Sequence, residues 1–232
     1  MIEKQINSFN DFLGYLNDNK KSNSWLYRGQ SNTAWKLIPK IGREPYKDID
    51  DYKAIKAWKR RASIFINRNY ESWWDWITIA QHHGVPTRLL DWTFTPLVAA
   101  FFAAIDDKEK DGAIFTYKYE MFVKPETVDP FEIKKTIVYR PTSITERVIN
   151  QNSIFTIHPK PFDPLESSST KTTLQKWIIK ADTKSDFLHE LNLLGVNYST
   201  IFPDLNGLAK HICWFYENIE YWTDDRNDDV SI

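Results

Sequence analysis

The residues best suited to chemistry gather between Gln81 and Trp92, in the segment QHHGVPTRLLDW. An imidazole can donate or accept a proton near neutral pH, and an amide beside it can hydrogen-bond a ligand. We therefore predict catalytic roles for His82 and His83, and contacts with a ligand for Gln81 and Thr87.

A second candidate is Arg28, which lies in WLYRGQ near the end of a predicted strand. An arginine in this place is free to fork onto a phosphate or a carboxylate. Gly29 permits close backbone approach or a positive φ, and Tyr27 completes an aromatic-Arg-Gly triplet that we assign to substrate binding. Spacing alone equally allows Arg28 to make a structural ion pair.

Arg88, Asp91 and Trp92 admit both a ligand-binding and a structural interpretation. Arg88 is predicted to hold an anionic group, yet its spacing of three residues from Asp91 also permits a local ion pair. Such a pair would hold the loop against the core, and we assign Asp91 to that structural role. Trp92 is interpreted as a packing anchor, with an aromatic platform for a base or nicotinamide ring as the alternative.

Two further catalytic candidates, Glu146 and Gln151, precede the predicted strand SIFTIHP and could project into a cleft. No metal is expected, because adjacent histidines rarely bind one ion and no third ligand follows at a motif-like spacing. Cys213 is the only cysteine, which excludes an internal disulfide, and the apolar pattern around it predicts that it is buried. The sequence contains no P-loop, G-x-S-x-G elbow or G-x-G-x-x-G loop.

The composition indicates a globular chain, with 42% hydrophobic and 26% charged residues among 232. Its net charge of −1 gives no overall field that would draw it to nucleic acid or anionic lipid. The longest apolar run, Leu97 to Ile105, is too short to span a bilayer, and the N-terminus lacks the regions of a signal peptide. We therefore expect a cytoplasmic protein without membrane contact.

The elements that must position these residues are interspersed helices and strands. Helical spacing from Trp73 ends at Gly84, so the residues from Gln81 to His83 occupy a last turn, and VPTRLLDW is interpreted as the connection that follows. Thr95 and Pro96 then begin a helix that is apolar on every side and is therefore expected to be buried. Further helices are predicted over 6–17, 49–69, 184–195 and 205–221, and strands in WLYRGQ, DGAIFTYKY, KKTIVYRP, SIFTIHP and QKWIIKA.

These elements predict an α+β fold, because no regular βαβ alternation is present. We expect a single mixed domain over residues 1–222, in which a small sheet packs with several helices around the buried central helix. The acidic segment 223–232 is expected to be a disordered tail.

Two blocks, WLYRGQSNTAWKLIPKIGRE and AQHHGVPTRLLDWTFTPLVAAFFA, resemble the signature blocks of the FRG domain family. The family is named for its aromatic-Arg-Gly motif, which corresponds here to Tyr27, Arg28 and Gly29. The later blocks RVINQNSIFTIHP and LNLLGVNYSTIFPDLNGLA also resemble the family, so the likeness covers roughly residues 5 to 218. The family is a largely bacterial and phage group without one established general activity.

The triplet is also similar to the first motif of arginine-type mono-ADP-ribosyltransferases. In those enzymes the arginine holds NAD phosphate and ribose, a Ser-Thr-Ser strand supports the site, and a glutamate stabilises the oxocarbenium-like centre. Arg28 matches the arginine, the Ser-Thr-Ser strand has no clear counterpart, and Glu146 or Gln151 would take the third position without the usual Glu-x-Glu or Gln-x-Glu context.

This likeness implies an enzyme that acts on NAD or another nucleotide, with a protein or nucleic-acid target, as a toxin or anti-phage effector. NAD would then be a substrate rather than a resident cofactor. The alternative is a non-catalytic module that binds a ligand, a nucleic acid or a protein.

Overall fold

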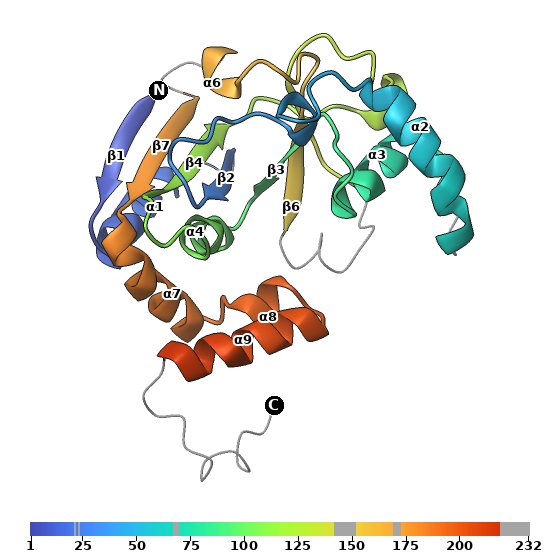
Figure 1. Ribbon diagram of the computed structural model, residues 1–232. Coiled ribbons are helices and arrows are strands. Elements are labelled where there is room, and N and C mark those ends of the chain that lie inside the picture. The colour runs from blue at the N-terminus through green and yellow to red at the C-terminus, as the bar shows by residue number, and fades with distance from the viewer. Residues whose placement is uncertain (21, 23, 67–69, 142–151, 169–172, 219–232) are drawn as a thin grey trace.

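The computed structural model describes the chain except for residues 21, 23, 67–69, 142–151, 169–172 and 219–232. Within this described part, the strands form one seven-stranded mixed sheet with helices packed against it (Figure 1). The fold is α+β and forms one domain, as predicted. Across the sheet the strands are β1 (Ile2–Ile6), β7 (Leu174–Ile179), β4 (Gly112–Lys118), β2 (Trp25–Gln30), β3 (Leu89–Thr93), β6 (Ser153–Ile157) and β5 (Ile137–Tyr139).

Two of these strands, β1 and β3, are absent from the sequence prediction. β1 lies at the sheet edge and pairs with β7 in parallel. β3 reads LLDWT and falls in the segment that we interpreted as a connection. Because β3 lies inside the sheet and is buried on both faces apart from Asp91, it lacks the polar alternation by which half-buried strands are recognised.

The sheet consists of two blocks of strands that meet between β2 and β3. On one side, β2 pairs with β4 over six consecutive residue pairs. On the other side, β3 pairs with β6 over five. Between the blocks, β2 and β3 are in register at the single pair Tyr27 and Thr93, so the two strands diverge beyond it. We call this place the seam.

Helices cover the sheet and surround the seam, and each begins or ends as its residues dictate. Ser8 caps the first helix by accepting a hydrogen bond from the backbone N–H of Asp11, and Gly84, at φ 78°, ends the helix that carries Gln81. The α-helices of the described residues are α1 (Phe9–Asn19), α2 (Asp51–Ala62), α3 (Trp73–His82), α4 (Pro96–Ala104), α6 (Leu165–Ser168), α7 (Lys184–Leu193), α8 (Tyr198–Ile201) and α9 (Leu205–Asn218), and the 3-10 turns are η1 (Lys40–Gly42), η2 (Ser63–Phe65), η3 (Pro125–Thr127) and η4 (Ala181–Thr183).

The buried central helix is α4, as predicted, and it packs directly on β2 and β4 (Figure 1). Its small residues allow an unusually close approach. A Cβ on Gly29 would lie 1.9 Å from the carbonyl oxygen of Ala99, and one on Gly112 would lie 2.2 Å from that of Ala103. Gly29 therefore permits close packing of α4, which is the first of the two roles that its sequence suggested.

The C-terminal helix departs from one prediction. Cys213 is exposed rather than buried, because the fully buried positions of α9 are Gly207 and Trp214. The predicted acidic tail, 223–232, lies outside the described residues. In the part of the chain that is described, no helix has both the length and the apolarity needed to cross a bilayer.

Candidate functional site

A cleft of about 370 Å³ opens at the seam, between the last turn of α3 and the flank of α4. Its size lies within the range of about 300–1,000 Å³ that is typical of small-molecule sites. The cleft brings together residues that are far apart in the sequence, including Arg28 from β2 and Asp91 from β3. Its wall is formed by Tyr27, Arg28, Gly29, Gln81, His82, Gly84, Asp91, Trp92, Thr93, Val98, Ala99, Phe102, Ser153 and Phe155.

Arg28 occupies the seam where the ladder between β2 and β3 ends. Its Nη1 donates to the backbone oxygen of Asp91 at 2.7 Å and lies 3.6 Å from the carboxylate of the same residue. The guanidinium thus satisfies a strand carbonyl that has lost its backbone partner, which such a group requires when it is buried. Part of the role of Arg28 is therefore structural.

The remaining donors of Arg28 are only partly satisfied. The side chain is 16% exposed, and its Nε is buried without a hydrogen-bond partner among the described residues. Burial is the main cause that lowers the pKa of Arg28 to about 10; the charge of Asp91 opposes this shift, and the charge of Arg43 contributes to it to a smaller extent. At neutral pH the group is still charged, so the cleft wall holds a desolvated cation.

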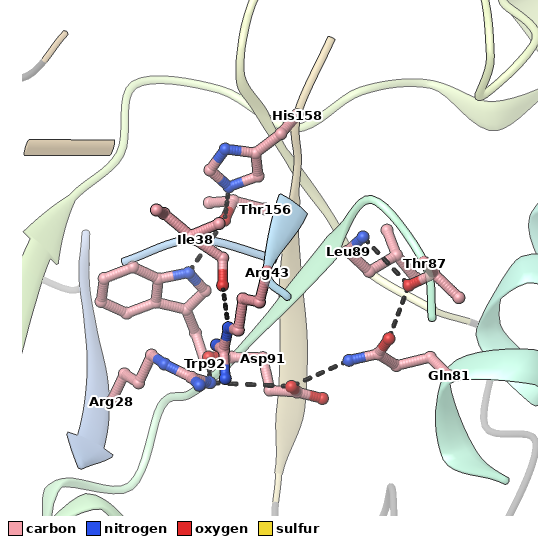
Figure 2. A network of polar contacts seen from close by, with 10 residues as sticks. All are labelled: Arg28, Ile38, Arg43, Gln81, Thr87, Leu89, Asp91, Trp92, Thr156 and His158. Carbon is pink, nitrogen blue, oxygen red and sulfur yellow. Dashed lines mark hydrogen bonds and ion pairs between the residues drawn. The ribbon is translucent and has the colours of Figure 1, made fainter. Parts of the chain in front are cut away.

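Arg43 adds a second positive charge beside the cleft. Its Nε donates to the backbone oxygen of Ile38 at 2.8 Å, and Figure 2 shows its guanidinium directed toward Asp91. Burial lowers the pKa of Arg43, and the charge of Asp91 raises it. Arg28 is the arginine that forms an ion pair with Asp91, at 3.6 Å, and the charge of Arg43 also acts on that carboxylate. Two positive charges therefore face one negative charge at this end of the cleft.

Asp91 is held from its other side by Gln81. The Nε2 of Gln81 donates to Asp91 Oδ2 at 2.9 Å, while the hydroxyl of Thr87 donates to Gln81 Oε1 at 2.5 Å (Figure 2). Thr87 in turn accepts from the backbone N–H of Leu89 at 3.1 Å. This relay fixes which end of the amide faces Asp91. The carboxylate is 53% exposed and therefore remains accessible from the cleft.

A second chain of hydrogen bonds runs behind Trp92. Its indole Nε1 donates to Thr156 Oγ1 at 3.0 Å, and a second hydrogen bond of 2.9 Å joins Thr156 Oγ1 to His158 Nε2. The tautomer of the imidazole sets which of these two groups is the donor. Burial, with the charge of Arg28 adding to it, lowers the pKa of His158 to about 3 and keeps the ring neutral.

Residues 23–112 match the family model of the FRG domain. The chain contains an FRG domain. No curated protein and no solved structure matches the chain.

The matched part of the FRG domain supplies most of the cleft. It includes Arg28, Gln81 and Asp91, together with the α4 residues of the wall. The β6 wall, formed by Ser153 and Phe155, lies beyond the matched residues.

Arg88 is not in the wall of the cleft, and the pairing with Asp91 that its spacing permits is wrong, while its contact with a ligand stays a prediction. Arg88 forms a two-pronged ion pair with Asp51 of α2, with Nε and Nη2 each 2.7 Å from a carboxylate oxygen. Its guanidinium also lies over the ring of Phe131, 5.1 Å from the centroid. A spacing of three places Arg88 and Asp91 on opposite faces of an extended chain, whereas the predicted pairing used helical spacing.

The other predicted ligand contacts separate into wall residues and supporting residues. Tyr27 lines the cleft but is mostly buried against Trp177, with ring centroids 6.2 Å apart. Thr87 is fully buried and positions Gln81 instead of lining the cleft. Trp92 both packs in the core and lines the cleft, in agreement with its interpretation as an anchor.

The predicted catalytic residues also lie in different places relative to the cleft. His82 is in the wall of the cleft, whereas His83 is exposed outside it and lies near Trp58 and His82, with ring centroids 6.3 and 5.0 Å away. Glu146 and Gln151 lie outside the described residues. Asp91, predicted to be structural, joins Arg28 and Gln81 and is also a half-exposed carboxylate in the wall of the cleft.

Sequence reasoning missed three residues around the site. Arg43, Ser153 and His158 are not among the site residues that the sequence predicted. Arg43 had a usable signal, since it follows Arg28 within the same family block, whereas the position of His158 depends on strand register. Among the described residues, no group of three His, Cys, Asp or Glu side chains could hold a metal ion.

Proposed function

We propose that the Arg28 cleft binds a nucleotide of the NAD type through its phosphates and acts on it with ADP-ribosyltransferase-like chemistry. The observation that carries the proposal is the excess of positive charge beside the cleft, because Arg28, which pairs with Asp91, and the neighbouring Arg43 together outnumber that carboxylate. A phosphate would supply the missing negative charge and accept the free donors of Arg28, as arginine–phosphate pairs commonly do.

The walls of the cleft suit the remaining parts of such a ligand. Phe102, Val98 and Phe155 provide apolar surface for a base or a nicotinamide ring. Ser153 and Gln81 provide polar groups that can hydrogen-bond ribose hydroxyls.

Asp91 is the group in the cleft that can stabilise developing positive charge. In the proposed reaction, the bond between ribose C1′ and the nicotinamide nitrogen breaks, and its electron pair leaves with nicotinamide. The carboxylate of Asp91 stabilises the oxocarbenium-like C1′, as oriented charges do in enzyme sites. Water or an acceptor nucleophile then forms the new bond to C1′ and loses its proton, for which His82 in the wall is the candidate base.

Cleavage of NAD also suggests a cellular role. An enzyme that consumes NAD depletes a cofactor on which the cell depends, which supports a role as a toxin or an anti-phage effector. Induced expression is then expected to arrest bacterial growth, and Asp91→Asn is expected to abolish the arrest. Equal arrest by both forms would contradict this role.

Purified protein incubated with NAD provides the direct test. Binding is measured by calorimetry and release of nicotinamide by chromatography. We expect Arg43→Gln to weaken binding about tenfold, and Asp91→Asn to retain binding while losing turnover. Arg60→Gln on the exposed face of α2 is the matched control and should change neither.

Three results would revise the proposal in different ways. Absence of NAD and nucleotide binding would overturn it entirely. Binding that Arg43→Gln leaves unchanged would place the ligand elsewhere. Binding without any turnover would assign the domain to the alternative class, a non-catalytic binding module.

A further inference from the structure

A larger hollow of about 660 Å³ lies on the face of the sheet opposite α4. Along β4, Ile114 packs in the core around α4, whereas Phe115 belongs to the cluster on the other face. Tyr117, two residues after Phe115, points to that same second face. The wall of the hollow combines the end of β4 with later segments of the chain. We call this hollow the lysine groove, and its wall includes Tyr117, Lys118, Tyr119, Lys134, Lys135 and Lys160.

The charge of the lysine groove is not compensated locally. Its wall contains Lys118, Lys134, Lys135 and Lys160, against only two carboxylates, Glu120 and Asp163. No ion pair joins any of the four ammonium groups to a carboxylate of the described residues. Some lysines elsewhere do form such pairs, as Lys4 does with Asp18 at 3.2 Å and Lys180 with Asp111 at 2.9 Å. A concave surface with excess positive charge attracts an anion even though the whole chain has a net charge of −1.

Two aromatic rings accompany these lysines, and other rings fix both of them in place. Tyr117 packs against Trp92, with centroids 5.5 Å apart and planes inclined at 36°. Tyr119 packs against Phe122, with centroids 4.7 Å apart. Both tyrosines are partly exposed. Rings supported in this way are rigid platforms on which a planar base can stack without ordering a flexible side chain.

From this combination we propose that the lysine groove binds a single-stranded nucleic acid. The lysines contact successive phosphates, and the tyrosines stack on bases. A duplex fits less well, because its base faces are hidden within the helical stack and cannot reach the tyrosines. The proposal does not depend on a ligand in the Arg28 cleft, since no residue lines both hollows and their cations differ.

Fluorescence anisotropy with a labelled oligouridylate of about twelve nucleotides tests the proposal, since this length is within known site sizes. We expect binding that weakens steeply as salt rises from about 50 to 200 mM. The double variant Lys134→Gln/Lys135→Gln should weaken binding at least tenfold and flatten the dependence of log K on log salt by about 1.4, or about 0.7 for each lost phosphate contact. The matched control is Lys53→Gln/Lys56→Gln on exposed α2, which should leave the affinity unchanged.

The stacking part of the proposal has its own variant, Tyr119→Leu, with thermal unfolding measured to verify the fold. We expect it to weaken RNA binding while leaving the binding of inorganic polyphosphate unchanged. Absence of RNA binding at low salt, or equal loss in both lysine double variants, would overturn the groove as a site. Equal affinity for RNA, polyphosphate and polyglutamate, with no effect of Tyr119→Leu, would overturn nucleic acid as its ligand and leave a general anion site.

Discussion

The side-chain amide of Gln81 donates to the carboxylate of Asp91 at 2.9 Å, which ties the last turn of α3 to the middle of the sheet. Asp91 is thereby oriented without being buried. The orientation depends on Thr87, whose hydroxyl selects the carbonyl end of the amide and leaves its NH₂ group for Asp91.

Thr87→Val should therefore destabilise the protein although its shape is preserved. The change leaves Gln81 Oε1 and the buried backbone N–H of Leu89 without their partner, and an unsatisfied buried group costs about 1–3 kcal/mol. Urea unfolding measures the difference. Thr127→Val is the control, because the hydroxyl of Thr127 donates to Lys124 at an exposed 3-10 turn, and its loss should cost less than about 0.5 kcal/mol. Equal effects of the two changes would contradict the proposed relay.

Arg88→Met should lower the free energy of unfolding by about 3–5 kcal/mol, because it leaves the buried carboxylate of Asp51 without its partner. The double variant Asp51→Leu/Arg88→Met should recover much of this loss, which chemical denaturation would detect. An exposed pair provides the comparison, since Lys4→Met should change stability by less than about 1 kcal/mol. If Arg88→Met unfolds no more easily than Lys4→Met, the ion pair is not structural.

Gly29→Ala should destabilise the protein by about 3 kcal/mol or more, because the added Cβ meets the backbone of α4 at 1.9 Å, where no side chain can move away. Gly14→Ala should instead raise the free energy of unfolding. Gly14 is in α1 with no neighbouring atom within 4 Å of its Cβ position, so alanine should stabilise the helix by about 0.5–1 kcal/mol. Thermal unfolding of both variants distinguishes tight packing from a general intolerance of substitution.

His158 should make stability depend on pH below its ordinary pKa. The folded protein keeps the ring neutral down to pH about 3, whereas the unfolded chain takes up a proton near pH 6.5. This contribution to stability is therefore complete above pH about 6.5 and falls as pH decreases, by up to about 1.4 kcal/mol per pH unit.

Urea unfolding at several pH values, compared between the wild type and His158→Gln, isolates this contribution. A glutamine amide can still hydrogen-bond with Thr156 but does not titrate. The difference in unfolding free energy between the two proteins should narrow as pH falls from about 6.5 to 4, while the shared carboxylates cancel in the comparison. A difference that does not vary with pH would show that His158 is not held neutral by the fold.

Local patterns predicted much of the framework, because helix caps and apolar stripes depend on neighbours in sequence. Gly84 ends α3 as expected, and the uniformly apolar run from Pro96 is indeed a buried helix. The prediction failed where distant partners decide the outcome. β3 owes its strand pairing to β6, and Arg88 pairs with an aspartate 37 residues earlier.

The candidate site shows the same division. Arg28, Gln81 and His82 were correctly grouped, since their residue types and the family blocks marked them. Asp91 could not be placed in the cleft without knowing that Leu89–Thr93 is a strand. The side of the sheet to which its side chain points depends on the register of that strand. Cys213 was misplaced because an apolar neighbourhood in sequence does not reveal which side of α9 meets the core.

The seam gives the sheet a mechanical property. The single residue pair Tyr27 and Thr93 joins the two blocks of strands, each of which is well paired internally. A molecule that contacts both Arg28 and Asp91 would link the two blocks of strands and hold them together. A ligand bound in the cleft should then slow the hydrogen exchange of backbone amides in β2 and β3, on both sides of the seam.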